Sequence, residues 1–266
     1  RVRRQRQMCI RDSCITAHGA DCRNYGELAG IDECKNFFAE IFDVDPLDVM
    51  VGGNSSLNMM FDTIAGFMTK PVVEGCKPWY EVKNRKFLCP SPGYDRHFAI
   101  TEYFDFDLIP VPMTENGPDM DVVEKLVEND DSIKGIWCVP KYSNPLGITF
   151  SDETVKRFAA LKPAAKDFRI MWDNAYCVHD VTDTPDELLS LMAECRKTGN
   201  VDLPIMFTST SKITFPGSGV AAMAASDNNM KVIKNRYQYQ VISYDKMNML
   251  RHARFFGDLN GVKEHM

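Results

Sequence analysis

Short apolar runs alternate with amphipathic stretches along most of this chain. Apolar runs at residues 49–51, 86–89, 107–111, 135–139, 169–172, 205–208 and 220–225 have the length of buried strands. Between them, residues 31–42, 57–68, 122–128 and 152–161 carry apolar side chains at helical spacing. Strands separated by helices predict an α/β fold, with a mainly parallel sheet covered by helices on both faces.

The composition is typical of a globular chain with a substantial core. The 266 residues are 44% hydrophobic and 26% charged, which excludes a disordered, collagen-like or coiled-coil chain. The 37 acidic and 31 basic residues are spread along the sequence, so we expect no nucleic-acid partner and no membrane partner. The nine cysteines form no C-x-x-C pair, and several lie in apolar runs. We therefore expect reduced thiols and a cytoplasmic location.

Both ends of the sequence differ from its middle. Residues 1–7 are basic and patternless, and residues 8–13 resemble one translated frame of a transposase adapter used in DNA library preparation. We interpret residues 1–13 as a non-native leader, with a natural basic tail as the alternative. Residues 250–266 are typical of a helix, a glycine-containing turn and the start of another element, without a closing signal. We expect a longer natural protein.

Polar residues follow four of the predicted strands, at residues 53–56, 141–147, 173–176 and 209–212. Ligands bind beyond the carboxyl ends of the strands in an open parallel sheet. The first of these strand tips opens a helix with free N–H groups and two hydroxyls, which suits a phosphate, although it matches neither the P-loop nor the dinucleotide fingerprint. Each tip also has a plain structural interpretation: an N-cap, an Asn-Pro turn, a capping carboxylate and a solvated lysine.

The order of these four tips resembles the fold type I aminotransferases that use pyridoxal 5'-phosphate. The strings at residues 23–26, 51–57 and 210–217 look most like the bacterial aspartate aminotransferase subgroup related to MocR-type regulators. The resemblance covers residues 14–266. It implies an N-terminal segment at 14–48, a cofactor-binding large domain at 49–250 and the start of a truncated, smaller C-terminal domain at 251–266.

The resemblance also implies a role for individual side chains around the cofactor ring. Lys212 matches the lysine that condenses with the cofactor aldehyde and later moves a proton of the substrate. Asp173 matches the carboxylate that keeps the pyridine nitrogen protonated. Asn144 and Tyr176 match residues that hydrogen-bond the ring O3', and Tyr94 takes the place of the aromatic residue that stacks on the ring.

Phosphate contacts are implied at the first and the last tip: Gly53, Asn54, Ser55 and Ser209. Many relatives carry an arginine shortly after the Pro-Gly that follows the lysine, whereas this sequence has Ser218-Gly219 after Pro216-Gly217. We expect Ser211, Ser218 or another subunit to replace part of that positive charge. Tyr25 matches a tyrosine that reaches the phosphate of a neighbouring subunit, which implies a homodimer.

The implied reaction is transamination between amino-acid and 2-oxo-acid substrates, with no metal. L-Aspartate and 2-oxoglutarate would give oxaloacetate and L-glutamate by a ping-pong mechanism. Relatives supply the arginine that grips the substrate carboxylate from the smaller domain, so we expect these 266 residues alone to be inactive. The alternatives are an aminotransferase of another specificity, such as one for alanine or aromatic substrates, and the effector domain of a MocR-type transcription regulator. A globular protein without cofactor would make all four strand tips coincidental.

Overall fold

The computed structural model describes residues 14–180 and 182–266, so the predicted leader at 1–13 lies outside it. One sheet holds eight strands in the order β1-β8-β7-β6-β5-β2-β3-β4. Their bounds are β1 Val49–Val51, β2 Lys86–Ser91, β3 Asp107–Thr114, β4 Gly117–Pro118, β5 Ile133–Cys138, β6 Arg169–Asp173, β7 Pro204–Ser209 and β8 Ala221–Ala225. Strands β3, β2, β5, β6 and β7 pair in parallel, while β8 runs antiparallel to both of its neighbours. The predicted mainly parallel sheet is confirmed.

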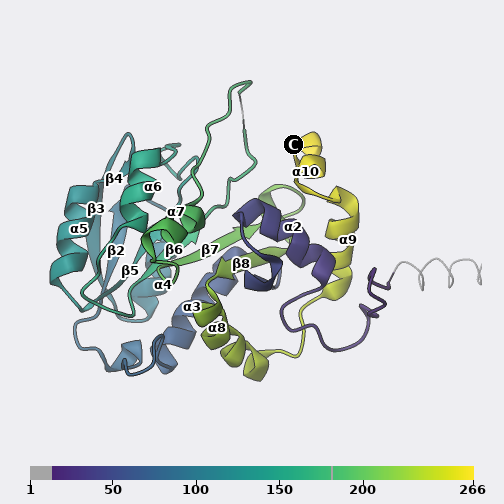
Figure 1. The fold of residues 1–266 in the computed structure, drawn as a ribbon, viewed down its shortest axis with the longest axis horizontal. Coiled ribbons are helices and arrows are strands. Elements are labelled where there is room, and N and C mark those ends of the chain that lie inside the picture. Colours follow the sequence, from purple (N-terminus) through teal and green to yellow (C-terminus); the bar gives the residue numbers. More distant parts are fainter. Residues whose placement is uncertain (1–13, 181) are drawn as a thin grey trace, which may run out of the picture.

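Helices cover both faces of this sheet (Figure 1). The first face packs against α2 (Asp32–Phe42), α5 (Met120–Asn129), α6 (Asp152–Ala159), α7 (Leu191–Thr198), α9 (Lys246–Phe256) and α10 (Leu259–His265). The second face packs against α3 (Ser56–Thr69), α4 (Asp95–Tyr103) and α8 (Asp227–Gln240). Each layer buries its own apolar cluster, as expected for an α/β fold.

Alternation along β6 decides which side chains reach which layer. Ile170 and Trp172 join the apolar cluster of the first face, and Met171 joins that of the second. Successive strand residues point to opposite faces, so Asp173 falls on the second face, beneath α4. The carboxylate that ends β6 therefore lies on the opposite side of the sheet from the Trp172 indole.

The first described helix lies beside the last two (Figure 1). Phe37 of α2 stacks on Phe256 of α9 with ring centroids 5.6 Å apart, and the Leu259 amide donates to the Glu40 carboxylate at 3.0 Å. Helix α9 runs across the predicted domain boundary between residues 250 and 251. That boundary stays a prediction.

Among the strands and α-helices of the described residues, β4, α4, α7 and α8 were not predicted from the sequence. Strand β4 is only two residues long, and α8 is mostly polar, so neither carries a strong periodic signal. In the described part of the chain, no helix combines the length and hydropathy that a membrane span requires.

Candidate functional site

Two of the predicted strand tips meet at the carboxyl edge of β6 and β7. These strands pair in parallel, with Asp173 opposite Phe207, and the Asn174 amide donates to the Phe207 carbonyl at 2.8 Å. The two loops that follow bring Lys212 Nζ to 4.1 Å from the centroid of the Tyr176 ring. The sheet thus places the predicted lysine and the predicted tyrosine in contact across 36 residues of sequence.

The Asp173 carboxylate is buried in an aromatic surrounding on the second face of the sheet. Its Oδ2 lies 3.0 Å from His97 Nε2, and the two side chains are only 6% and 1% exposed. His97 stacks on Trp137 at 4.7 Å, and the Tyr94 ring meets the His97 ring edge-on at 5.0 Å. The other carboxylate oxygen, Oδ1, is buried and has no hydrogen-bond partner among the described residues. A buried carboxylate oxygen of this kind is costly unless a donor reaches it.

His97 was not predicted as a site residue from the sequence. Tyr94 caps the start of α4, and His97 lies three residues further on, where a side chain shares the same helix face. That spacing is a usable signal only once α4 is known to lie over the end of β6. His97 therefore joins the site as a side chain that holds one oxygen of Asp173.

A fitting partner for Asp173 Oδ1 is a ring N–H, such as that of a protonated pyridine nitrogen. Tyr94, His97, Trp137 and Asn144 line, with other residues, a small cavity of 20 Å³. Aromatic faces and a buried carboxylate, with the Lys212 amine at the tip of the neighbouring strand, are surroundings that suit pyridoxal 5'-phosphate. These residues fit that cofactor.

The predicted phosphate turn joins β1 to α3. Ser55 is the N-cap of α3, yet its side chain makes no capping hydrogen bond, so its hydroxyl is not spent on the helix. The turn is fastened to the lysine loop: Ser211 Oγ donates to the Asn54 carbonyl at 2.8 Å, and Asn54 Nδ2 donates to the Gly217 carbonyl at 3.2 Å. Gly53 accepts from the Ala221 amide at 2.8 Å.

The two predicted phosphate serines of the lysine tip differ in their surroundings. Ser209 ends β7 on the second face and is buried. Ser211 already gives its single hydroxyl hydrogen to Asn54, so it can only accept further hydrogen bonds. A contact with a phosphate would need that hydrogen, and the predicted role of Ser211 stays a prediction.

Tyr25 lies in an exposed position. The residue is 81% exposed, and its carbonyl accepts a hydrogen bond from Lys246 Nζ at 3.1 Å. No contact of the described residues joins the Tyr25 ring to Lys212 or to Asp173. Its role at a neighbouring subunit stays a prediction.

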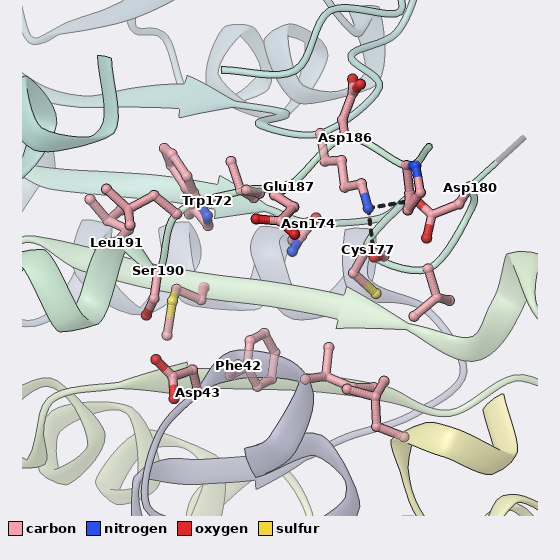
Figure 2. A pocket seen from close by; sticks show the side chains of 18 of the residues that line it. Phe42, Asp43, Trp172, Asn174, Cys177, Asp180, Asp186, Glu187, Ser190 and Leu191 are labelled. Atoms are coloured by element: carbon pink, nitrogen blue, oxygen red, sulfur yellow. Dashed lines mark hydrogen bonds and ion pairs between the residues drawn. The ribbon is translucent and has the colours of Figure 1, made fainter. Parts of the chain in front are cut away.

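A larger pocket of 420 Å³ opens on the first face of the sheet (Figure 2). Trp172 and Asn174 line it, and both alternate with Asp173 along the chain, so the pocket lies across the sheet from the Asp173 carboxylate. Lys141 Nζ lies 2.7 Å from Asp180 at its edge. This hollow is therefore separate from the predicted cofactor residues. Within residues 14–180 and 182–266, no group of three or more metal-ligating side chains is present.

A family model, a curated protein and a solved structure all match this chain to aspartate aminotransferases. Residues 8–266 match the family model for aspartate amino-transferase. An aspartate aminotransferase of Corynebacterium glutamicum is 44% identical over 250 residues, which are 94% of this chain and 58% of that protein. The crystal structure of an aspartate transaminase from the same species aligns with a TM-score of 0.91 at 43% identity, covering 94% of this chain and 59% of that one. The chain thus spans 58% of the length of this curated relative.

Two more distant matches bear on the fold and on the alternatives. The structure of LysN, an α-aminoadipate aminotransferase from Thermus thermophilus complexed with N-(5'-phosphopyridoxyl)-L-leucine, aligns with a TM-score of 0.74 at 18% identity. It covers 92% of this chain and 58% of that one, and it shows a shared fold. The HTH-type transcriptional regulator YcxD of Bacillus subtilis is 29% identical over 145 residues, covering 52% of this chain and 29% of that protein.

Proposed function

This chain belongs to the aspartate amino-transferase family, and from that premise we propose that the protein transfers the amino group of L-aspartate to 2-oxoglutarate with pyridoxal 5'-phosphate as cofactor. The products are oxaloacetate and L-glutamate, released in turn by a ping-pong mechanism. The observation that carries the proposal is the buried, unpartnered Oδ1 of Asp173 on the same sheet edge as Lys212. The name of the Corynebacterium glutamicum relative supports aspartate as the amino donor.

Bound pyridoxal 5'-phosphate would supply an aldehyde that links to amino groups and a ring that accepts the electron pair of a broken Cα–H bond. Asp173 would accept a hydrogen bond from the ring nitrogen through Oδ1. His97 holds Oδ2 at 3.0 Å, which fixes the plane of the carboxylate. Because both side chains are buried, the negative charge is poorly screened by water and favours a protonated ring nitrogen.

Lys212 would hold the cofactor covalently and, once the amino group of the substrate displaces it, act as the base that moves the Cα proton. The face of the Tyr176 ring lies 4.1 Å from its Nζ, and a cation held there is attracted to the ring. The ring thereby keeps the amine at the end of β6 when no other partner is bound. Tyr94 would stack on one side of the cofactor ring, while Asn144 and Tyr176 would hydrogen-bond its hydroxyl oxygen.

The phosphate would lie at the start of α3. The first N–H groups of this 14-residue helix and the Ser55 hydroxyl are donors, and the helix dipole favours an anion there. Ser209 adds a hydroxyl from the end of β7. The arginine of many relatives is absent after Gly217, so backbone and hydroxyl donors carry a larger share of the phosphate binding than in those relatives.

We extend the proposal to the assembly and the location. The exposed ring of Tyr25 supports the idea that it reaches the phosphate of a second subunit in a homodimer. The cysteine pattern of the sequence supports a cytoplasmic location.

Borohydride reduction followed by peptide mapping tests the cofactor lysine. We expect the pyridoxyl group on Lys212, because Lys212 is exposed at the site whereas Lys141, the other lysine at a strand tip, is buried in an ion pair with Asp180. Lys141 is therefore the internal control. Labelling at Lys141 in place of Lys212 would show that the site is misassigned.

Turnover separates the proposed function from its alternatives. The natural protein loaded with cofactor should convert L-aspartate and 2-oxoglutarate to oxaloacetate faster than it uses L-alanine or an aromatic amino acid. A preference for one of those donors would indicate another aminotransferase specificity. The partial similarity to YcxD favours the regulator as the second candidate. A regulator domain would be labelled at Lys212 but would show no sustained turnover with any donor.

A further inference from the structure

Histidines from three different elements contact residues 212–214, two through a main-chain carbonyl and one through a side chain. In the loop after β6, His179 Nε2 lies 3.3 Å from the Lys212 carbonyl oxygen. From α10, His265 Nε2 lies 3.2 Å from the Ile213 carbonyl oxygen, and from α9, His252 Nε2 lies 3.1 Å from Thr214 Oγ1. Three successive residues are thus fixed by imidazoles, and His179 is the one that bonds to the lysine itself.

The hydrogen bond to the Lys212 carbonyl defines which nitrogen of the His179 ring carries a hydrogen. A carbonyl oxygen only accepts, so Nε2 carries the hydrogen and donates it to Lys212. In the neutral ring, Nδ1 then has a free lone pair, and this atom is buried with no partner among the described residues. Protonating Nδ1 would bury a second N–H without an acceptor, so the neutral ring is favoured.

His179 also touches the aromatic ring that faces the lysine amine. Its imidazole packs edge-on against Tyr176, with centroids 5.5 Å apart at an interplanar angle of 85°. The His179 amide donates to the Tyr176 carbonyl at 3.2 Å, which closes the turn that carries both rings. Within this turn, His179 therefore hydrogen-bonds the Lys212 main chain, and the Tyr176 ring contacts the Lys212 amine.

The charged groups around His179 shift its pKa in opposite directions. Burial is the main cause that lowers the pKa of His179, and the positive charges of Lys212 and Lys141 lower it further. The Lys212 carbonyl and the Asp180 carboxylate oppose this shift. The net lowering agrees with a neutral imidazole that donates through Nε2.

We propose that His179 is a positioning residue for Lys212, whose Nε2–H fixes the Lys212 carbonyl and so holds the amine over the Tyr176 ring. This inference rests on the proposed function only in that Lys212 is the cofactor lysine. The placement of the amine can be measured without cofactor and without turnover.

Reductive methylation with 13C-formaldehyde places NMR-visible methyl groups on the amine of Lys212, and Lys212→Arg identifies their signal. The Tyr176 ring current should displace that signal upfield in the unmutated protein, since the amine lies 4.1 Å from the ring centroid. Tyr176→Leu defines the undisplaced position. In His179→Phe, which keeps a ring beside Tyr176 but no donor, we expect most of the displacement to be lost.

His179→Gln is the conservative variant, because its amide can still donate to the Lys212 carbonyl, and it should keep the displacement. His18→Phe is the matched control, since His18 is a surface histidine whose side chain is 72% exposed. If His179→Phe does not fold, His179→Met replaces it as the variant without a donor. Retention of the displacement without a donor, or its equal loss in His179→Gln, would overturn the proposal.

Borohydride labelling of the unmutated, unmethylated protein is run in parallel. Absence of a pyridoxyl group on Lys212 would contradict the proposed function, whereas the NMR comparison would still decide the positioning role of His179. The two failures are therefore distinguishable.

Discussion

The Asp173 carboxylate at the end of β6 is surrounded by aromatic rings, and only one of its two oxygens has a hydrogen-bond partner among the described residues. His97 holds Oδ2 of Asp173, while Oδ1 is buried without a donor. In a low-dielectric setting a charge that is aimed at a ligand acts more strongly than it would in water. The cost of burying it unpaired is offset when a ligand brings the missing N–H.

Substituting Asp173 tests this arrangement. Asp173→Asn keeps the shape of the side chain but removes its charge, so we expect some cofactor binding to remain while kcat with L-aspartate falls on the order of 100-fold or more. Asp180→Asn is the matched control, because Asp180 pairs with Lys141 at the edge of the separate 420 Å³ pocket. Near-native turnover of the Asp173 variant would place the partner of the ring nitrogen elsewhere.

The lowered pKa of His179 has a consequence for stability against pH. Its ordinary value is 6.5, and burial is the first cause of the lowering. The folded state therefore binds this proton less readily than the unfolded chain, so the stabilisation is complete above pH 6.5 and is lost as the pH falls from there towards the folded pKa. We expect the urea midpoint to drop more between pH 7 and pH 5 in the unmutated protein than in His179→Gln. An equal drop in both proteins would argue against a neutral His179 with a buried Nδ1.

At the scale of elements, the site depends on two loops that are tied together. The loop between β7 and β8 carries Lys212, and the turn before α3 carries the predicted phosphate donors. Hydrogen bonds of Ser211 and Asn54 join the two. The Lys212 loop also closes on itself, since the Thr210 amide donates to the Val220 carbonyl at 2.9 Å.

Gly219 tests how tightly this loop is packed. A Cβ at Gly219 would lie 2.7 Å from Ser211 Oγ and 2.8 Å from the Ser211 amide nitrogen. Gly219→Ala should therefore destabilise the fold by about 1–3 kcal/mol and weaken cofactor binding, as overpacking of a dense region does. Thermal unfolding and cofactor titration measure the two effects.

Gly217→Ala is the control within the same loop, because a Cβ there would meet nothing within 4 Å. It should leave stability unchanged or raise it by up to about 1 kcal/mol. Equal behaviour of the two alanine variants would mean that the contact between Gly219 and Ser211 does not constrain the loop.

At the scale of the whole molecule, the proposed homodimer predicts complementation between subunits. Tyr25→Ala and Lys212→Ala should each lower activity strongly when present in both subunits. A mixed dimer keeps one site with both residues intact, because Lys212 comes from one subunit and Tyr25 from the other. Mixing the two inactive proteins under conditions of subunit exchange should restore up to half of the activity per dimer. No recovery, with exchange shown by mass spectrometry, would place Tyr25 outside the neighbouring site.

Seven of the eight strands and the polar residues that follow four of them could be predicted from the sequence alone. Every apolar run interpreted as a strand lies within one residue of a strand of the sheet. Four predicted helices overlap α2, α3, α5 and α6, and the helix predicted at the start of residues 250–266 overlaps α9. This succeeded because burial on both faces forces short continuous apolar runs, and one buried helix face forces a period of 3.6 residues. A polar residue that follows such a run is also recognised from adjacent positions, which is why Asp173 and Lys212 could be identified in the sequence.

Which of these residues are in contact could be seen only in the folded chain. His97 meets Asp173 across 76 residues of sequence, and the reversed direction of β8 has no local signature. The hydrogen bond from the Ser211 hydroxyl to the Asn54 carbonyl is equally remote, because the two residues are 157 positions apart in the sequence. Such contacts depend on strand order and on the direction in which each side chain leaves its element. Neither property is contained in a local pattern, because both are set by the packing of the whole sheet against its two helical layers.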